Sequence, residues 1–158
     1  MTKAEHGVNP IPEGFRAATP YLIVRDAERA LAFYAKIFGA VEQGRLTDPD
    51  GKIVHAEMQI GDSRLMLADE MPGFTSPLAL GGTPVIISLY VPDVDAVVER
   101  AVAEGATVMI PVGDQFYGDR SGRIKDPFGH LWIVSTHKED VSPEEMDRRA
   151  RAWKKRDE

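Results

Sequence analysis

The chain has 158 residues, a usual length for one domain, and a formal net charge of −6. The absence of cysteine excludes disulfides, thiolate metal sites and a cysteine nucleophile. The acidic balance argues against nonspecific nucleic-acid binding, which needs a basic surface. No apolar run approaches the ~18 residues of a membrane span, and no signal-peptide pattern opens the sequence. We therefore expect a cytoplasmic protein with no nucleic-acid or membrane partner.

The first part of the chain predicts an arm, a strand, a helix and three further strands. Residues 1–17 contain Pro10 and Pro12 and lack periodicity, which is typical of an extended arm. Asp26 stands where a helix N-cap belongs, and Gly39 stands where the helix should end. The predicted helix is Ala27–Phe38, and the predicted strands are 20–24, Val41–Leu46, Ile53–Ile60 and Arg64–Ala68.

The second part repeats this pattern after a linker rich in proline and glycine at residues 71–82. Val24-Arg25-Asp26 matches Val91-Pro92-Asp93, and Gly39-Ala40 matches Gly105-Ala106, at an offset of 66 or 67 residues. Such a repeat implies two βαβββ modules, over residues 18–70 and 83–137, and hence an α+β fold. The elements expected in the second module are strand Val85–Val91, a helix from Asp93 through Glu104, and strands Thr107–Pro111, Arg120–Lys125 and Leu131–Thr136.

The stretch GRIKDPFGHLWIVSTH, residues 122–137, carries a turn signal between two strands. Pro127 presets φ and Gly129 supplies a positive φ, so a β-hairpin is predicted, with Trp132 in the core. Beyond it, residues 142–158 predict a C-terminal helix. Ser142 suits its N-cap, and its acidic start and basic end complement the helix dipole.

These features together resemble the vicinal oxygen chelate superfamily, which includes glyoxalase I, extradiol dioxygenases and bleomycin-resistance proteins. The resemblance rests on the paired modules, the Val-x-Asp helix starts, Phe33-Tyr34 followed by Phe38-Gly39, and the DPFGHLW turn. The segments HAEMQIGDSRLMLADE and YGDRSGRIKDPFGHLW point to the PhnB-like branch. The resemblance implies a domain over residues 18–141 whose modules form a curved mixed sheet around a concave cleft. It implies no single activity, because the superfamily hosts several reactions and simple sequestration.

The resemblance also locates the positions of a metal site. Metal-dependent members take four ligands from the first and last strand of each module, and these positions fall on Thr19, Met66, Ile86 and Ile133. Such side chains are poor donors for a hard divalent cation. We therefore expect no metal at these positions and no cofactor, and a divalent metal only at a relocated site.

A polar pair is expected on the concave face of the first module. Alternation along strand Ile53–Ile60 places His55 and Glu57 opposite the helix-covered face, with side chains about 7 Å apart. The pair suits a shared binding site, or a base with an orienting carboxylate. The alternative is a solvent-facing polar pair on a half-exposed sheet.

A second polar set lies in the second module and contains Tyr90, Gln115, Tyr117, Asp119 and Arg120. Aromatic rings with a few hydrogen-bonding groups suit a small-molecule pocket, whereas the alternative is an ordinary polar loop. If the concave face holds a ligand, the polar residues His55, Glu57 and Tyr90 should converge on one cavity. Its apolar lining should then be Met66, Ile86 and Ile133.

Three functions remain open from the sequence. The first is a metal-independent protein that binds or sequesters a small organic molecule in the cleft. The second is a lyase, isomerase or dioxygenase-like enzyme that uses His55 and Glu57 as relocated metal ligands or as an acid–base pair. The third is a protein-interaction module. A homodimer is expected in addition, because pairing covers the exposed strand edges of such modules.

Overall fold

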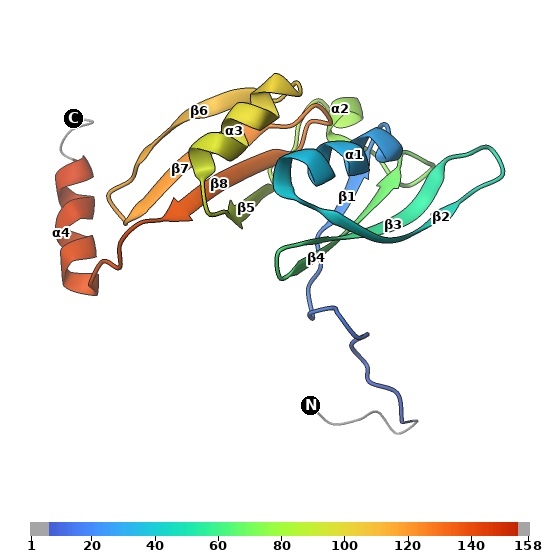
Figure 1. The fold of residues 1–158 in the computed structure, drawn as a ribbon, viewed down its shortest axis with the longest axis horizontal. Coiled ribbons are helices and arrows are strands. Elements are labelled where there is room, and N and C mark those ends of the chain that lie inside the picture. Colours follow the sequence, from blue (N-terminus) through green and yellow to red (C-terminus); the bar gives the residue numbers. More distant parts are fainter. Residues whose placement is uncertain (1–6, 155–158) are drawn as a thin grey trace. The chain divides into compact units, whose positions relative to one another are not determined.

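The structure is a computed structural model that describes residues 7–154, so the expected arm and C-terminal helix lie partly outside the described residues. The chain divides after Gly81 into two units, whose elements are labelled in Figure 1. No helix within residues 7–154 combines the length and the apolar character needed to cross a membrane.

The first unit contains one βαβββ module and a short additional helix. Its sheet has the order β1-β4-β3-β2, in which β1 runs parallel to β4 and the other neighbours are antiparallel. Helix α1 ends at Gly39, which has a φ of 69°, as expected for a C-terminal glycine. The elements are β1 (Tyr21–Val24), α1 (Ala27–Phe38), β2 (Val41–Thr47), β3 (Ile53–Ile60), β4 (Ser63–Asp69) and α2 (Pro77–Leu80).

The second unit repeats the same topology, with the sheet order β5-β8-β7-β6 and a parallel β5–β8 pair. Its elements are β5 (Ile86–Tyr90), α3 (Val94–Ala103), β6 (Thr107–Asp114), β7 (Asp119–Lys125), β8 (Leu131–His137) and α4 (Pro143–Lys154). The predicted α+β fold of two βαβββ modules with a C-terminal helix is therefore confirmed.

Each long helix begins in the same way in both modules. The N-caps Asp26 and Asp93 have nearly identical backbone angles, with φ of −143° and −141° and ψ of 91° and 93°. Each carboxylate accepts a hydrogen bond from the backbone three residues further on. The last strand of each module supplies another acceptor. Asp69 Oδ1 lies 2.7 Å from the nitrogen of Ala27, and Thr136 Oγ1 lies 2.9 Å from that of Val94.

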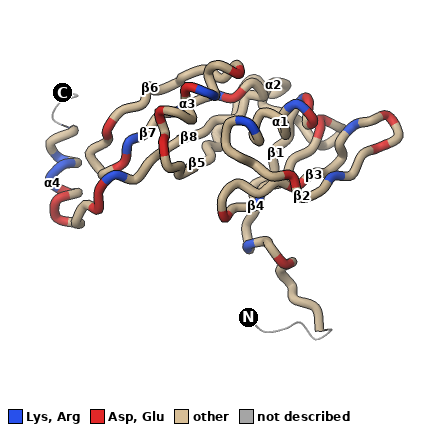
Figure 2. Tube along the Cα trace, in the orientation of Figure 1, with Lys and Arg blue, Asp and Glu red and all other residues tan. Residues whose placement is uncertain are grey.

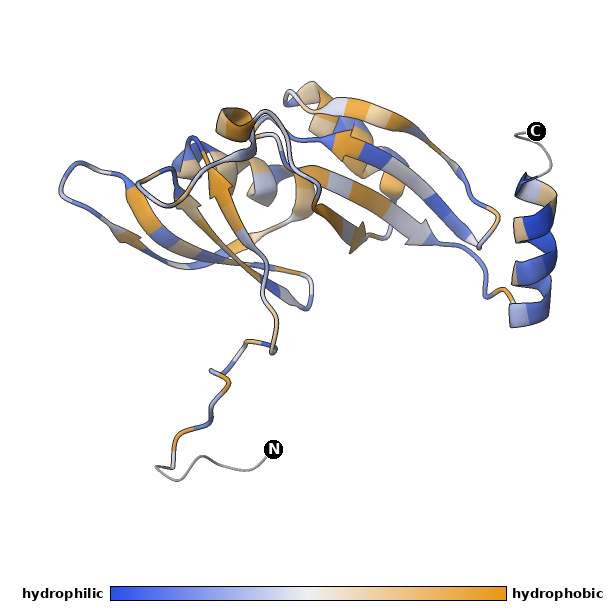
Figure 3. Cartoon of the chain, turned by 180° about the vertical axis from the view of Figure 1, so that it is seen from behind, coloured by the Kyte–Doolittle hydropathy of each residue, from blue (hydrophilic) through white to orange (hydrophobic). Residues whose placement is uncertain are grey.

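Strand alternation divides each sheet into a helix-covered face and an open face. In β3, Ala56, Met58 and Ile60 are buried beneath α1, whereas His55 and Glu57 point to the opposite side and are half-buried. Figure 3 shows apolar and polar segments alternating along the strands of both units. We use the term open face for the side of each sheet that α1 or α3 does not cover.

Two elements differ from the sequence-based expectation. The linker at 71–82 contains the four-residue helix α2, whose start is capped by Ser76 through the backbone nitrogen of Ala79. Strand β6 continues through Pro111 to Asp114 instead of ending at the proline. Proline is tolerated there because β6 is an edge strand, where a missing N–H breaks no ladder on its outer side.

Asp126 organises the turn between β7 and β8. Its side chain is 3% exposed, and Oδ1 accepts hydrogen bonds from the backbone nitrogens of Phe128 and His130 at 2.9 and 3.0 Å. Its Oδ2 accepts from the indole nitrogen of Trp132 at 2.8 Å, which places the fully buried Trp132 ring in the core. Gly129 completes the turn with a φ of 89°. The predicted hairpin is thus anchored by one buried carboxylate.

Replacement of Asp126 should destabilise the fold strongly. Asp126→Ala leaves buried donors without partners, so we expect the free energy of unfolding to fall by about 3 kcal/mol. Asp48→Ala provides a matched control, because Asp48 accepts backbone bonds from Asp50 and Lys52 in a more exposed turn. The control should lose about 1 kcal/mol. Equal losses in the two variants, measured by urea denaturation, would contradict this role for Asp126.

Candidate functional site

A chain of hydrogen bonds crosses the open face of the first unit. The Tyr21 hydroxyl lies 2.8 Å from Nδ1 of His55, and Nε2 of His55 lies 3.2 Å from Oε1 of Glu57. The other carboxylate oxygen of Glu57 accepts from the Arg64 guanidinium at 3.1 Å. We name these four residues, Tyr21, His55, Glu57 and Arg64, the module-one network. The structure therefore brings the sequence-predicted pair together and adds a partner at each end.

The network gives each ring nitrogen of His55 a defined hydrogen-bonding role. A carboxylate only accepts hydrogen bonds, so Nε2 carries the proton that points to Glu57. In the neutral ring Nδ1 is then the acceptor, and the Tyr21 hydroxyl is its donor. Burial raises the pKa of Tyr21 above its ordinary value, which keeps this hydroxyl protonated. The arrangement is a tyrosine joined to a carboxylate through an oriented imidazole.

Register explains why these side chains meet. Met66 in β4 is paired with Tyr21 on one side and with Glu57 on the other, so all three share the open face. The Phe74 ring packs edge-on against Tyr21, with centroids 5.6 Å apart. The described part of the arm also contributes, because the Phe15 ring lies 4.9 Å from the Arg64 guanidinium carbon. The network thus has apolar and aromatic side chains around its polar atoms.

The four residues that the sequence analysis matched to metal-ligand positions carry poor donors for a divalent cation. Met66 lies on the open face of β4, Ile86 begins β5 and Ile133 lies within β8, whereas Thr19 precedes β1. A thioether and aliphatic side chains give a hard cation too few donors. At His55 both ring nitrogens have partners, and residues 7–154 contain no cluster of three or more acidic or histidine side chains that could hold a metal.

A second network occupies the second unit. Asp119 is 6% exposed, and its two oxygens lie 2.7 Å from the Tyr90 hydroxyl and 2.7 Å from Nδ1 of His137. Nε2 of His137 lies 2.7 Å from Asp140. We name these four residues, Tyr90, Asp119, His137 and Asp140, the module-two network. The hydrogen bond to Asp119 raises the pKa of Tyr90. The carboxylates of Asp119 and Asp140 raise the pKa of His137.

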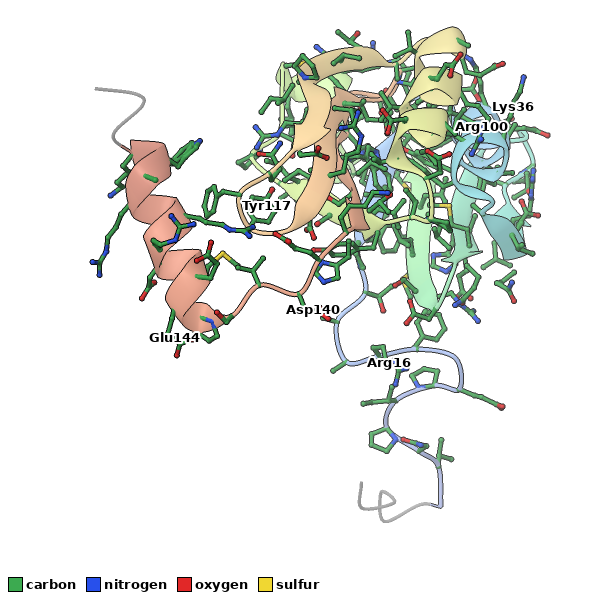
Figure 4. All side chains as sticks on the ribbon, turned by 60° about the vertical axis from the view of Figure 1, so that its left-hand side comes forward. Arg16, Lys36, Arg100, Tyr117, Asp140 and Glu144 are labelled. Atoms are coloured by element: carbon green, nitrogen blue, oxygen red, sulfur yellow. The ribbon has the colours of Figure 1, made fainter. Side chains whose placement is uncertain are left out.

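Sequence reasoning assigned no role to His137, because its partners come from other elements. Asp119 and His137 are directly paired across β7 and β8, and Asp140 lies in the segment that leads to α4 (Figure 4). A histidine that ends a strand, with an acidic residue three positions later, was the available signal. The pairing with Asp119 needs the hairpin register, which the turn at Asp126 fixes.

The structure brings together only part of the polar set that the sequence predicts in module two. Gln115, Tyr117 and Ile133 line one cavity of about 100 Å³ within the second unit. Arg120 lies elsewhere, since it follows Asp119 in β7 and alternation turns its side chain towards α3. There its guanidinium pairs with Asp95 at 2.7 Å and with Asp114 at 3.2 Å. The convergence of His55 and Glu57 with Tyr90, Ile86 and Ile133 on one cavity stays a prediction.

Helix α4 supports the loop between β6 and β7. The Trp153 ring packs on Phe116 with centroids 5.8 Å apart, and Arg149 donates to the carbonyl oxygen of Phe116 at 3.1 Å. Ser142 caps the helix through the nitrogen of Glu145, as the sequence predicts. Figure 2 shows acidic residues at the start of α4 and basic residues further along.

Comparisons with known proteins agree with the fold. The family model described as Glyoxalase/Bleomycin resistance protein/Dioxygenase superfamily matches residues 16–134. An uncharacterized protein of Mycobacterium tuberculosis is 45% identical over 135 residues, which are 82% of this chain and 79% of that protein. The crystal structure of PA1353 from Pseudomonas aeruginosa is 27% identical, with a TM-score of 0.65 over 77% of this chain and 98% of that one. TioX from Micromonospora sp. ML1 is also 27% identical, with a TM-score of 0.60 over 80% and 100%.

The raised pKa of His137 should be directly measurable. We expect its NMR titration midpoint to lie above the ordinary value of 6.5, since two carboxylates favour the protonated ring. The stabilisation of the fold by this charge is then complete below about pH 6.5 and is lost as the pH rises through the raised pKa. Asp119→Asn and the exposed Asp140→Asn should each lower the midpoint, and His137→Gln identifies the signal. A midpoint at or below 6.5 in the unaltered protein would contradict the assignment.

Proposed function

Because the chain belongs to the Glyoxalase/Bleomycin resistance protein/Dioxygenase superfamily, we propose that it binds a small organic molecule on the open face of its first sheet. The observation that carries this proposal is the module-one network, in which Tyr21, His55 and Glu57 form a connected set of polar groups. Met66 and Phe74 provide apolar contact beside it. Polar groups of fixed direction next to apolar and aromatic surface are what small-molecule sites require.

The charges of the network favour an uncharged ligand group at this place. Glu57 shares its two oxygens between His55 and Arg64, so its charge is already matched by the Arg64 guanidinium. A cationic ligand would have to displace Arg64 from Glu57. An uncharged O–H or N–H group can instead donate to the Tyr21 oxygen while its carbon atoms pack on Phe74.

The same geometry supports acid–base catalysis as the second candidate function. Glu57 orients His55, and His55 accepts the hydrogen bond of the Tyr21 hydroxyl, so a proton can pass between the phenol and the imidazole. This step needs only the side chains of the chain itself. A binding protein would return its ligand unchanged, whereas an enzyme would convert it, and mass spectrometry of the recovered ligand distinguishes the two.

We further propose that two copies of the chain associate. The edge strands β2 and β6 expose Val41, Leu46, Val108 and Met109, and unpaired edges with apolar side chains favour pairing. Light scattering at micromolar concentration should therefore give twice the mass of one chain. The mass of a single chain throughout the concentration range would overturn this proposal.

The binding proposal predicts a specific effect of Glu57→Gln. This change keeps the shape of the side chain but removes the charge that holds the His55 proton and Arg64. For ligands found in a panel of small phenols and aromatic amides, we expect affinity to fall about tenfold, the effect of losing one good polar contact. Isothermal titration calorimetry provides the measurement.

Glu42→Gln is the matched control for this experiment. Glu42 lies on β2 and pairs with Arg45, which also reaches Glu28 of α1, so it stands outside the network. The control should change affinity by less than about twofold, since exposed ion pairs contribute little. Equal affinity of the Glu57→Gln and Glu42→Gln variants for every ligand of the panel would refute the site.

A further inference from the structure

Arg123 in β7 is a half-buried cationic side chain whose Nε atom is buried without a partner. Its Nε atom is inaccessible to solvent and has no hydrogen bond. Within residues 7–154 no carboxylate forms an ion pair with its guanidinium, in contrast to Arg120, which pairs with both Asp95 and Asp114. Buried donors without partners are rare in native proteins because they lose their hydration and gain nothing in return. A hydrogen-bond acceptor bound at this arginine would therefore be stabilising.

The neighbouring strands β6 and β8 place apolar side chains on both sides of Arg123. Its partners across β6 and β8 are Ile110 and Ile133, and both isoleucines line the same cavity as Arg123. Their side chains flank the aliphatic part of the arginine and leave its charged end at the cavity. An apolar surround strengthens the attraction between a guanidinium and an anion, because less water screens the charges.

The remaining polar groups of the cavity are suited to donate hydrogen bonds. The Ser121 hydroxyl accepts from Ser135 at 3.0 Å, so its own proton is available to another acceptor. The Gln115 amide nitrogen donates to the carbonyl of Gly113 at 3.2 Å and retains its second hydrogen. Tyr117 adds a hydroxyl, and Figure 4 shows this residue at the loop between β6 and β7. Among the residues that the structure describes, no acidic side chain lines the cavity.

The rim of the cavity is formed before any ligand enters. Gly118 closes the loop by donating to the carbonyl of Gln115 at 3.2 Å, and its own carbonyl accepts from Lys138 at 2.9 Å. A side chain at Gly118 would meet the backbone of Glu139 and would need a φ of 100°, so this tight contact requires glycine. Helix α4 holds the neighbouring Phe116 from outside. Preorganised donors lose little freedom on binding.

We propose that this cavity binds an oxyanion, either a carboxylate or a phosphoryl group, through the Arg123 guanidinium with Ser121, Gln115 and Tyr117 as additional donors. The planar guanidinium matches both groups with paired hydrogen bonds. A volume of about 100 Å³ exceeds the need of one ordered water but is below that of a whole organic ligand. The site thus takes an anionic group of a larger molecule. It does not depend on the module-one site, and either can fail alone.

The test follows the Nε–H signal of Arg123 by NMR in the full chain. Inorganic phosphate, methylphosphonate, acetate and benzoate are added separately at constant ionic strength. We expect a saturable shift of this signal with at least one anion. Arg123→Gln should weaken that binding about tenfold or more, which is followed in the variants through the backbone amide signals of β7 and β8. Arg120→Gln is the matched control, because it removes the same charge from a residue three positions earlier in β7, on the opposite face of the sheet.

Each outcome decides the proposal. Saturable binding that is lost in Arg123→Gln and kept in Arg120→Gln supports the proposal. Tighter binding of phosphate and methylphosphonate identifies a phosphoryl ligand, and tighter binding of acetate and benzoate identifies a carboxylate ligand. An unshifted Arg123 signal with all four anions means that water alone fills the cavity and overturns the proposal. Equal weakening in both variants shows general charge attraction and overturns it as well. Thermal unfolding curves confirm that both variants are folded.

Discussion

One constraint shapes both halves of this protein: each four-stranded sheet is covered by a helix on one face only, by α1 in the first unit and by α3 in the second. Side chains alternate along a strand, and the face beneath the helix takes the apolar residues. In β3 this buries Ala56 and Met58 and leaves His55 and Glu57 on the open side. A register slip of one residue would exchange the two sets and bury both polar side chains. The position of the candidate site is therefore a consequence of the core.

Polar groups on an open face that is half-buried need partners, and the two units meet this need in related ways. In each, a carboxylate joins a histidine to a further polar group. Glu57 connects His55 with Arg64, and Asp119 connects His137 with Tyr90. The protons differ, however. His55 lies between a phenol and a carboxylate, which orient its ring, whereas two carboxylates stabilise the protonated form of His137. The first arrangement suits recognition or proton transfer, and the second fastens β8 to the segment before α4.

The sequence predicted the elements of the fold and part of the site. Local signals sufficed for α1, for the Asp126 turn and for the internal repeat, because caps, glycines and alternation act over a few residues. The hydrogen bonds that link Tyr21 and Arg64 to the pair of His55 and Glu57 could not be predicted from the sequence. Tyr21 and Arg64 lie in β1 and β4, and the local sequence of a strand does not show with which distant strand it pairs. The side-chain direction of Arg120 could have been predicted, because Arg120 follows Asp119 in β7 and side chains alternate along a strand. Arg123 gave no signal, as its lack of a partner exists only in the folded chain.

The central claim, that the open face of the first sheet binds a small organic molecule, can be tested most directly by mapping where ligands bind. Backbone amide signals of the full chain would be followed while a mixture of small phenols and aromatic amides is added. The account predicts that the largest saturable shifts lie in β1, β3 and β4 around Tyr21, His55 and Met66. Shifts confined to the outer surface of α1 or to α4, with those strands unchanged, would contradict it.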